Sequence, residues 1–467
     1  MKNIGLILLL LLTISCSSDD DSLPQNSSPQ ELKLESVNFD GKKVTIDWND
    51  VQDADNDNIY YSLYINSILV EETTKSISTS FLQYNNEYVG RIIATDKNGG
   101  VSELEFTFNS PQSKILFFAD SAGNLTAYDL ITDQILWESE NSFVEAHTAD
   151  KNVIFTGQNG INAHDILTGE ILWTSTPSIN YNKQYRNIIT DKTNIYAFDA
   201  DSNLHCITAD GKTKLWERSF LRYYASLAIG ESKIYVSSTN DDNLYALNKD
   251  SGTTDWSFRI DSRGTSGVTK IETNPLIVEN NIYFGDNKGR FYSFNKNNGA
   301  LAWTLELAES VISPGFYDKF YASPTIYKNT IIAATYNTLY GIDKENGTIK
   351  WKHDRSIGNI ESSPFVYNDQ IYFGFSNNGS GGLVCLSAND GSMNWTYSLP
   401  HNTTTSPIVF EDTVYIGDWD KNFHAVNAST GALKWMLKTK AFIIRSPTIV
   451  LGNSDTVIYP SSHGLKN

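Results

Sequence analysis

Short runs in which apolar and polar residues alternate fill the chain from residue 32 onward. Residues 44–48, 60–65 and 88–94 are clear examples. Successive side chains of a strand point to opposite faces, so this alternation predicts strands with one buried face. Clusters of Gly, Pro, Asn and Asp separate the runs and predict tight turns. The pattern therefore predicts an all-β protein.

Residues 31–110 contain about seven such runs, which favours a small β-sandwich. This segment resembles a fibronectin type III or related immunoglobulin-like module. The resemblance implies that Trp48 is the buried strand aromatic and that residues 94–96 close a late strand. It also implies a spacer role, because modules of this kind usually hold other domains apart.

Asp53, Asp55 and Asp57 form a ladder of carboxylates within the predicted module. Hard cations such as Ca²⁺ bind several oxygen ligands, so the spacing is of interest. An EF-hand would require Gly at residue 58 and Glu at residue 64, where this chain has Asn and Tyr. We interpret the ladder as a solvated turn between strands, and calcium binding stays open.

An internal repeat dominates the chain after residue 113, with a Trp recurring about every 40 residues. A small residue stands ten positions before each Trp, and a Gly stands four positions before most of them. The Trp residues are Trp137, Trp173, Trp216, Trp256, Trp303, Trp351, Trp395 and Trp435. The small residues are Ala127, Ala163, Cys206, Ala246, Ser293, Gly341, Cys385 and Ala425. The glycines are Gly169, Gly252, Gly299, Gly347, Gly391 and Gly431, with Gly211 five positions before its Trp and Asp133 in the first copy.

Each copy is expected to form a four-stranded antiparallel sheet. The Gly supplies a positive φ for a tight hairpin, and an Asp or Asn four residues earlier starts the turn. We expect the small residue to let neighbouring sheets approach closely and the Trp to cover the remaining surface. A single sheet of this size cannot bury both faces, so the copies must stack. Eight copies stacked radially predict an eight-bladed β-propeller over residues 113–464.

Copies such as 343–351 and 427–435 resemble the propeller repeat of the pyrroloquinoline-quinone (PQQ) type. The strand openings Ser323-Pro324, Ser363-Pro364, Ser406-Pro407 and Ser446-Pro447 fit the same family. The resemblance implies the fold. It says less about function, because this repeat serves both quinone dehydrogenases and cofactor-free scaffolds. Among the scaffolds is the propeller lipoprotein of the outer-membrane β-barrel assembly machinery.

The two ends of the repeat region are expected to meet. Residues 446–451 and 456–459 follow the last Trp and read as strands, whereas the first copy begins abruptly at Lys114. We predict that the C-terminal segment completes the first blade. Residues 115–118 and residues 456–459 could each form the same strand of the first blade, and the sequence leaves open which of them does.

Composition narrows the function classes. The 467 residues carry 36 Lys and Arg against 54 Asp and Glu, a formal net charge of −18. Nucleic-acid binding needs clustered cations, so a general nucleic-acid binder is excluded. With 40% hydrophobic and 12% aromatic residues the chain can build a core, so it is not a disordered protein.

The N-terminus reads as a targeting signal. Lys2 precedes the apolar run 4–14, which is too short to span a bilayer, and Cys16 is followed by an acidic stretch. This arrangement resembles a bacterial lipoprotein signal, which implies removal of residues 1–15, lipidation of Cys16 and a flexible tether over residues 16–30. The acidic stretch resembles the export tag of Bacteroidetes surface lipoproteins. The resemblance implies an outer-membrane lipoprotein exposed on the cell surface, with a periplasm-facing orientation as the alternative.

The remaining cysteines argue against a quinone enzyme. Many PQQ dehydrogenases carry a vicinal Cys-Cys disulfide, and this chain has no adjacent pair. Cys206 and Cys385 occupy the small-residue position of two distant copies, so packing explains both and no disulfide between them is expected. We predict no cofactor and no enzymatic activity.

The histidines are interpreted mainly as strand residues. His205 and His424 take a position that Tyr fills in other copies, and His164 follows a small residue. His147 is less well explained, because it stands near the start of an inner strand. No metal site is predicted from these residues.

Candidate binding residues lie on the connections that lead from each Trp strand to the next copy. The connections 257–273 and 304–322 are the longest, and long loops on a rigid scaffold commonly carry binding sites. Aromatic residues and Arg there could stack on sugars or bind peptide edges and carboxylates. The alternative is that they only satisfy strand ends around a wet channel. The candidates are Tyr185, Arg186, Tyr224, Arg263, Lys270, Glu272, Tyr317, Tyr321, Glu361 and Arg445.

Three function classes follow. The leading hypothesis is a lipid-anchored, non-catalytic scaffold that binds envelope proteins and touches the membrane through its lipid alone. The second is a surface glycan-binding protein of a polysaccharide-uptake system. The third is a propeller polysaccharide lyase, in which His147, Arg186 and Tyr224 would act on a uronate.

Overall fold

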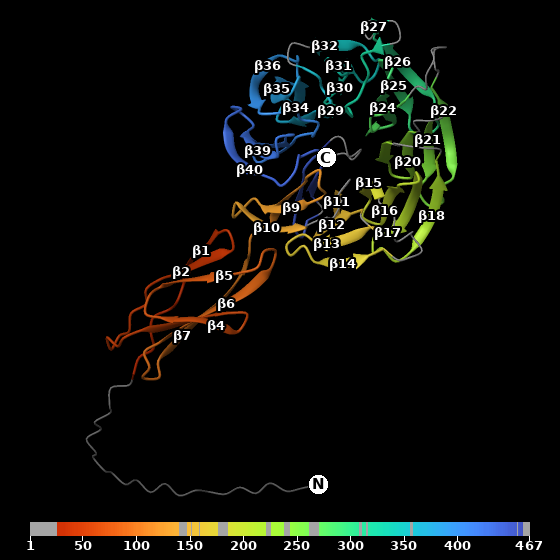
Figure 1. Cartoon of the computed structure of the whole chain (residues 1–467). Coiled ribbons are helices and arrows are strands. Elements are labelled where there is room, and N and C mark those ends of the chain that lie inside the picture. Colours follow the sequence, from red (N-terminus) through yellow and green to blue (C-terminus); the bar gives the residue numbers. More distant parts are fainter. Residues whose placement is uncertain are drawn as a thin grey trace, which may run out of the picture. The chain divides into compact units, whose positions relative to one another are not determined.

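The computed structural model describes residues 26–139, 147–150, 152–157, 159–175, 185–220, 226–237, 243–260, 270–307, 311–313, 316–354, 358–454 and 456–460. The chain divides into two compact units, residues 1–111 (unit 1) and residues 112–467 (unit 2). Figure 1 shows that both consist of strands. Within the described residues, no helix is long and apolar enough to cross a membrane.

Unit 1 contains two antiparallel sheets. The first has the order β1-β2-β5, formed by β1 (Leu34–Asp40), β2 (Lys43–Trp48) and β5 (Ile77–Phe81). The second has the order β4-β3-β6-β7, formed by β3 (Tyr60–Ile65), β4 (Ile68–Thr73), β6 (Glu87–Thr95) and β7 (Val101–Asn109). The three alternating runs singled out in the sequence are therefore β2, β3 and β6, as predicted.

One hydrophobic core joins these two sheets. Ile46 and Trp48 of the first sheet belong to the same buried cluster as Leu63 and Ile92 of the second. Trp48 is 1% exposed and meets Tyr61 edge-on, with ring centroids 5.6 Å apart. The prediction that Trp48 is buried is confirmed.

Unit 2 is a succession of antiparallel sheets. The first has the order β10-β9-β8-β41-β42, formed by β8 (Lys114–Ala119), β9 (Leu125–Asp129), β10 (Gln134–Ser139), β41 (Thr448–Leu451) and β42 (Val457–Ile458). The next three sheets take four consecutive strands each: β11 (His147–Asp150), β12 (Val153–Thr156), β13 (Asn162–Asp165) and β14 (Ile171–Thr174); β15 (Tyr185–Thr190), β16 (Asn194–Asp199), β17 (Asn203–Thr208) and β18 (Lys214–Ser219); β19 (Ser226–Ile229), β20 (Lys233–Ser237), β21 (Asn243–Asn248) and β22 (Thr254–Arg259).

Four further four-stranded sheets follow in the same manner. They are formed by β23 (Leu276–Val278), β24 (Asn281–Gly285), β25 (Arg290–Asn295) and β26 (Leu301–Glu306); β29 (Thr325–Tyr327), β30 (Thr330–Ala334), β31 (Leu339–Asp343) and β32 (Ile349–His353); β33 (Phe365–Tyr367), β34 (Gln370–Asn377), β35 (Ser380–Ser387) and β36 (Met393–Leu399); and β37 (Ile408–Phe410), β38 (Thr413–Gly417), β39 (Asn422–Asn427) and β40 (Leu433–Lys438). A two-stranded hairpin of β27 (Val311–Ser313) and β28 (Phe316–Tyr317) lies in the connection before β29.

Several successive sheets contact each other through their first strands, and β41 takes this place in the sheet that contains both ends of unit 2. Contacts join β41 to β11, β11 to β15, β15 to β19, β29 to β33 and β33 to β37. In Figure 1 the sheets of unit 2 follow one another in chain order around a common centre. This is the arrangement of a β-propeller, in which each sheet buries its faces against its neighbours.

The Trp of each of the first seven repeats packs on the turn Gly of the following repeat. A Cβ added at Gly347 would lie 2.6 Å from Cε3 of Trp303, and one at Gly431 would lie 2.8 Å from Cδ2 of Trp395. The indole of Trp303 also donates a hydrogen bond to the carbonyl oxygen of Lys344, 3.1 Å away. These glycines have the predicted positive φ, for example 75° at Gly347. The turn Gly therefore allows the tight hairpin of its own sheet and also leaves space for the Trp of the preceding sheet.

The small residue of each repeat lies opposite the Trp of the same repeat. It pairs across two strands of its own sheet with its own Trp, as Ala246 does with Trp256 and Gly341 with Trp351. A Cβ at Gly341 would lie 2.2 Å from Cε2 of Trp351. The small residue therefore makes room for the Trp of its own sheet. Cys206 and Ala246 also belong to buried clusters with residues of the following sheet, such as Ile234 and Ile282, so the small residue takes part in the close approach between sheets together with the turn Gly.

The Ser-Pro strand openings form a chain of hydrogen bonds from sheet to sheet, which we call the serine ladder (Ser323, Ser363, Ser406 and Ser446). The amide of Ser323 donates to Oγ of Ser363 at 2.9 Å, and the amide of Ser363 donates to Oγ of Ser406 at 3.0 Å. Ser406 continues to Ser446 at 2.9 Å. Each of these amides is thus satisfied by the next sheet, which ties the inner strands together.

The first sheet contains both ends of unit 2. β8 lies between β9 and β41, with Phe117 opposite Thr448, and β42 pairs with the far side of β41. Beyond β42, the buried hydroxyl of Tyr459 accepts a hydrogen bond from the amide of Ala149 at 3.1 Å, on the neighbouring sheet. The C-terminal segment therefore joins the first sheet as predicted. The open question between residues 115–118 and 456–459 is resolved because the two segments occupy different positions of one five-stranded sheet.

Candidate functional site

Two kinds of connection lie at the same end of every sheet in unit 2. Because neighbouring strands run antiparallel, the turn between the second and third strands and the connection that leaves the fourth strand emerge together. We call this end the connection face. It comprises, among the described residues, the turns 286–289, 335–338 and 418–421 and the connections 316–324, 358–364 and 400–407.

A buried Asp organises the turn between the second and third strands in four sheets. In each, Oδ1 accepts the amides two and four residues later, as Asp418 does from Asp420 at 2.8 Å and Asn422 at 2.9 Å. The four residues are Asp120, Asp199, Asp286 and Asp418. The repeated geometry makes these carboxylates structural elements of the connection face.

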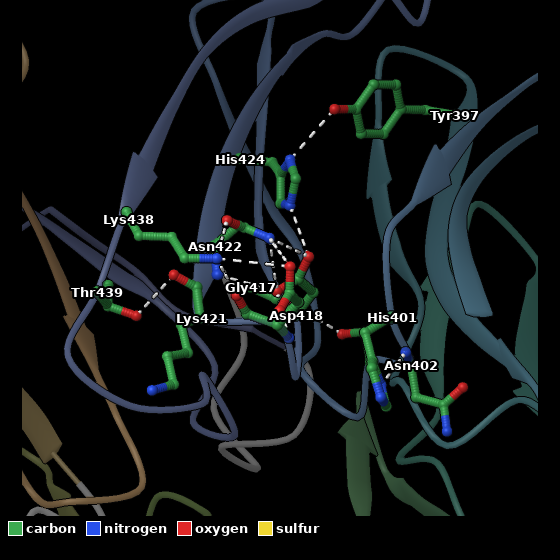
Figure 2. Close-up of polar contacts among 12 residues, drawn as sticks. Tyr397, His401, Asn402, Gly417, Asp418, Lys421, Asn422, His424, Lys438 and Thr439 are labelled. Atoms are coloured by element: carbon green, nitrogen blue, oxygen red, sulfur yellow. Dashed lines mark hydrogen bonds and ion pairs between the residues drawn. The ribbon is translucent and has the colours of Figure 1, made fainter. Parts of the chain in front are cut away.

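The second oxygen of three of these carboxylates binds the side chain six residues later. His205 lies 3.0 Å from Asp199, and the hydroxyl of Tyr292 donates to Asp286 at 2.9 Å. His424 Nε2 lies 3.0 Å from Asp418 Oδ2, and its Nδ1 lies 3.1 Å from the hydroxyl of Tyr397 (Figure 2). Sequence reasoning missed these pairs, although the spacing of six residues recurs in the chain and could have revealed them.

The environment of the Asp418 pair favours a structural role. His424 is fully buried, and so is Asp418. Burial is the largest influence and raises the pKa of Asp418, but the hydrogen bonds from His424 and Asn422 outweigh it and hold the pKa below its usual value. His205 is likewise 1% exposed. The interpretation of His205 and His424 as strand residues is confirmed, and neither ring is open to a substrate.

A partly exposed array on three successive sheets is the candidate site, which we call the rim cluster (Glu272, Lys319, Tyr321, Tyr336, Asn359 and Glu361). Lys319 is its centre. Its Nζ lies 3.4 Å from Oε2 of Glu272 and 4.4 Å from the ring centroid of Tyr321. Its carbonyl oxygen accepts the amide of Tyr336 at 2.9 Å. Two predicted candidates, Glu272 and Tyr321, are therefore brought together by a lysine.

Tyr336 extends the rim cluster to the next sheet. Its hydroxyl accepts a hydrogen bond from Nδ2 of Asn359 at 3.0 Å. Burial and the neighbouring carboxylate of Glu361 raise its pKa, so the phenol stays protonated at neutral pH. The predicted candidate Glu361 thus belongs to the same cluster. Sequence reasoning missed Tyr336 and Asn359. Tyr336 lies in the turn between β30 and β31 and Asn359 lies in the connection before β33, and only the folded structure places these two segments side by side.

The other predicted candidates lie elsewhere or outside the described residues. Lys270 is tied to the turn of its own sheet, where its amide donates to Oδ1 of Asn287 at 3.0 Å. Arg445 is half-buried beside Ser446 of the serine ladder. Tyr185, Arg186, Tyr317 and His147 lie in strands of which only the backbone is described. Tyr224, Arg263 and Cys16 lie outside the described residues.

A second aromatic feature of the connection face was not predicted. The rings of His401 and Trp419 stack, with centroids 6.2 Å apart and planes inclined by 25°. The carbonyl of Asn402 accepts the amide of Trp419 at 3.0 Å and so holds the two segments together. Both rings are partly exposed. Figure 2 shows His401 and Asn402 beside the Asp418 turn.

The two cysteines of unit 2 are buried and free. Burial raises the pKa of the Cys385 thiol to about 11 and that of Cys206 to about 12. Both thiols are therefore protonated and unreactive at neutral pH. They fill the small-residue position opposite Trp395 and Trp216, as packing predicted.

Comparison with known proteins places unit 2 in one family. The family described as outer membrane protein assembly factor BamB matches residues 100–220, 157–313, 240–409 and 375–465. A relative of this name from Moranella endobia is 22% identical over 274 residues, which cover 58% of this chain and 68% of the relative. The one from Yersinia pestis is 22% identical over 244 residues, which cover 51% of this chain and 60% of the relative.

Solved structures agree on the fold. BamB from Moraxella catarrhalis aligns with a TM-score of 0.53 at 18% identity, over 67% of this chain and 94% of that protein. A quinohemoprotein alcohol dehydrogenase from Comamonas testosteroni aligns with a TM-score of 0.52 at 11% identity, over 69% of this chain and 74% of that protein. Because the identities are low, these likenesses establish the β-propeller fold and leave the activity to other observations.

Proposed function

Because the chain belongs to the family described as outer membrane protein assembly factor BamB, we propose that it is a non-catalytic scaffold that binds protein partners in the bacterial envelope. The match to this family across residues 100–465 is the observation that carries the proposal. The name of the relatives suggests the partner class, which is a component of outer-membrane protein assembly. The proposal includes lipid anchoring through Cys16 at the outer membrane, on the cell surface.

The proposed architecture is a closed ring of eight blades preceded by a fibronectin type III-like spacer. Eight sheets of four or five strands among the described residues of unit 2, and the pairing of β8 with β41, support the ring. The order β4-β3-β6-β7 opposite β1-β2-β5, around one core, supports the spacer. A closed ring presents a rigid face with loops around it, which suits a scaffold.

The rim cluster is the proposed partner-binding surface. Lys319 has a side chain that is 36% exposed, and Tyr321 is 40% exposed, so both can be covered by a partner. Tyr321 supplies the kind of aromatic contact area that is enriched in interface hot spots, and the ammonium of Lys319 can donate a charged hydrogen bond to a partner. The buried state of the His205 and His424 pairs supports binding over acid–base catalysis.

Capture from solubilised envelope tests this proposal. The purified protein should retain components of outer-membrane protein assembly, identified by mass spectrometry. A double Lys319→Glu, Tyr321→Ala variant should weaken the binding of the captured component about 30-fold, the size of a hot-spot loss. Lys352→Glu is the matched control, since its side chain is 40% exposed on β32. Unchanged capture by the double variant would refute the rim cluster as the binding surface.

A second candidate, glycan binding, is favoured by the His401–Trp419 pair. Partly exposed stacked rings are a surface on which a sugar face can pack. A glycan array probed with the protein would then give a positive signal that a Trp419→Ala variant loses. An array without binding would contradict glycan binding and leave the scaffold function as the remaining proposal. The lyase alternative gains no support, because Arg186, Tyr224 and His147 have no described side chains.

A further inference from the structure

Two acidic loops and the first described residues meet at one end of unit 1. Residues 53–57 connect β2 to β3, and residues 96–100 connect β6 to β7. β3 and β6 are paired, with Tyr60 opposite Thr95, which places the two loops side by side. Asn98 Nδ2 donates to Oδ2 of Asp57 at 2.8 Å and so links them directly.

The segment that leads into β1 joins the same group. Asn26 Nδ2 donates to Oδ2 of Asp96 at 2.7 Å, and the amide of Ser27 donates to Oδ2 of Asp55 at 2.6 Å. Residues 26 and 27 therefore bridge the two loops. Asp53, Asp55, Asp57 and Asp96 all belong to these two linked loops.

The charge of these carboxylates is not balanced by the protein. Across the part of the chain that the structure describes, no ion pair with Lys, Arg or His involves any of the four. The ammonium of the neighbouring Lys97 lies over the ring of Tyr60, 3.5 Å from its centroid. Asp96 is 4% exposed and Asp53 is 6% exposed. Asp96 accepts hydrogen bonds from the side chain of Asn26 and from the amides of Asn98 and Gly100, but no described cationic side chain compensates the charge of the four carboxylates.

Asp53 gives the independent indication of a ligand. Its Oδ1 accepts the amide of Asp55 at 2.7 Å, which fixes the carboxylate in the loop. Its Oδ2 is buried and has no hydrogen-bond partner among the described residues. An acceptor that has lost water and gained no donor is strongly unfavourable unless a cation occupies the position.

Further oxygens converge on the same region at Gly100. A Cβ added there would lie 2.1 Å from Oδ2 of Asp96 and 2.6 Å from the carbonyl oxygen of Ser27. These two oxygens therefore lie close to one another beside Gly100, and a side chain at residue 100 would displace them. A carboxylate and a main-chain carbonyl are both ligands that Ca²⁺ accepts, whereas Zn²⁺ prefers nitrogen and sulfur.

We propose that this end of unit 1 binds one Ca²⁺ ion through Asp53, Asp96 and the carbonyl of Ser27, with the Asp55–Asp57 loop completing the oxygen shell. Within the described residues, no three His, Cys, Asp or Glu side chains stand together as a metal-binding group. The proposed site therefore depends on amide and main-chain oxygens besides its carboxylates, as calcium sites commonly do. The ion would fix the segment before β1 onto the two loops.

Thermal unfolding of the purified chelator-treated protein tests the proposal. Calcium modules outside the cell bind with a Kd of about 10⁻⁴–10⁻³ M, so a titration to several millimolar CaCl₂ covers the expected range. Ca²⁺ should raise the Tm of unit 1 by about 5 °C, and isothermal titration calorimetry should show one saturable site. Mg²⁺ should give a much smaller shift, because it demands a smaller octahedral shell.

Three Asp→Asn variants separate ligand binding from folding. Asp53→Asn and Asp96→Asn should lose the Ca²⁺-induced shift, with affinity at least about tenfold weaker. In chelator Asp53→Asn should match or exceed the wild-type Tm, because it removes an unpaired buried charge. Asp40→Asn, at the exposed β1–β2 turn, is the control and should keep the full shift. Absence of a Ca²⁺ shift in the wild type, an equal shift with Mg²⁺, or an unchanged shift in Asp53→Asn would overturn the proposal.

Discussion

Single buried carboxylates hold the turns of the connection face in place. Asp418 satisfies two turn amides with one oxygen and His424 with the other. Replacing water by three fixed donors compensates the cost of burial, which is why its pKa stays low despite that burial. The same arrangement at Asp199 and Asp286 makes these aspartates part of the repeat architecture.

Asp418→Asn should therefore change the pH dependence of stability. The folded pKa of Asp418 is depressed, so its contribution is complete above the unfolded carboxyl pKa of about 3.9 and is lost as the pH falls through the lower folded value. We expect the variant to lower the free energy of unfolding at pH 7 by about 2 kcal/mol and to flatten the loss of stability below pH 4. Denaturant unfolding between pH 2.5 and 7 measures both.

Asp420→Asn is the control for this substitution. Asp420 lies two residues away, is exposed, and stands 3.4 Å from the exposed Lys438. Its replacement should change the free energy of unfolding by less than about 0.5 kcal/mol. Equal pH profiles for the two variants would show that the buried pair has no special role.

At the scale of the element, each of the first seven sheets of unit 2 is joined to the next by a Trp that packs on a Gly. The hairpin after the third strand must place its Gly at positive φ, and the absent side chain then leaves room for the indole of the preceding sheet. The serine ladder adds hydrogen bonds between inner strands. Local turn geometry and packing between sheets therefore depend on the same residues.

Gly347→Ala should be much more destabilising than Gly379→Ala. Both glycines have positive φ, 75° and 94°, so Ala is strained at either position by about 1 kcal/mol. Only at Gly347 does the new Cβ meet an indole, at 2.6 Å, whereas nothing lies within 4 Å of a Cβ at Gly379. We expect an additional loss of about 1–3 kcal/mol for Gly347→Ala in denaturant unfolding. Similar losses for both variants would mean that the contact between the Cβ and the indole adds nothing to backbone strain.

At the scale of the whole molecule, stability depends on joining residues far apart in the sequence. β41 supplies the partner of β8, and Lys114 Nζ forms an ion pair with Glu411 of the last four-stranded sheet. The stacked rings of Phe118 and Phe423, with centroids 4.1 Å apart, pack the first sheet against the same neighbour. The first sheet is therefore where the two ends of unit 2 are held together.

A chain that ends at residue 447 should lose this connection. It lacks β41 and β42, so β8 has an unpaired edge and the adjoining sheets lose their shared partner. We expect the Tm of unit 2 to fall by more than about 5 °C and limited proteolysis to accelerate. A chain that ends at residue 460 keeps every described strand and should retain the wild-type Tm. Equal Tm values for the two chains would contradict the proposed closure.

The candidate site was only partly predictable from the sequence. Glu272, Tyr321 and Glu361 were chosen because they lie on long connections or at their ends, and all three join the rim cluster. Lys319 stands between two of them in space, and Tyr336 reaches Asn359 from a turn on the preceding sheet. Lys319 and Tyr321 share one connection, but the contacts Lys319–Glu272 and Tyr336–Asn359 join different sheets, and no spacing along the chain encodes them.

Strand positions, the positive φ of the turn glycines and the burial of Trp48 were determined by the sequence alone, because alternation and turn chemistry act over a few residues. The tertiary structure decided which sheet each Trp contacts, how the five strands of the first sheet are ordered and that Asp53 retains an unpartnered oxygen. These features arise from contacts between segments that are distant in the chain, whose geometry depends on how complete sheets and loops pack.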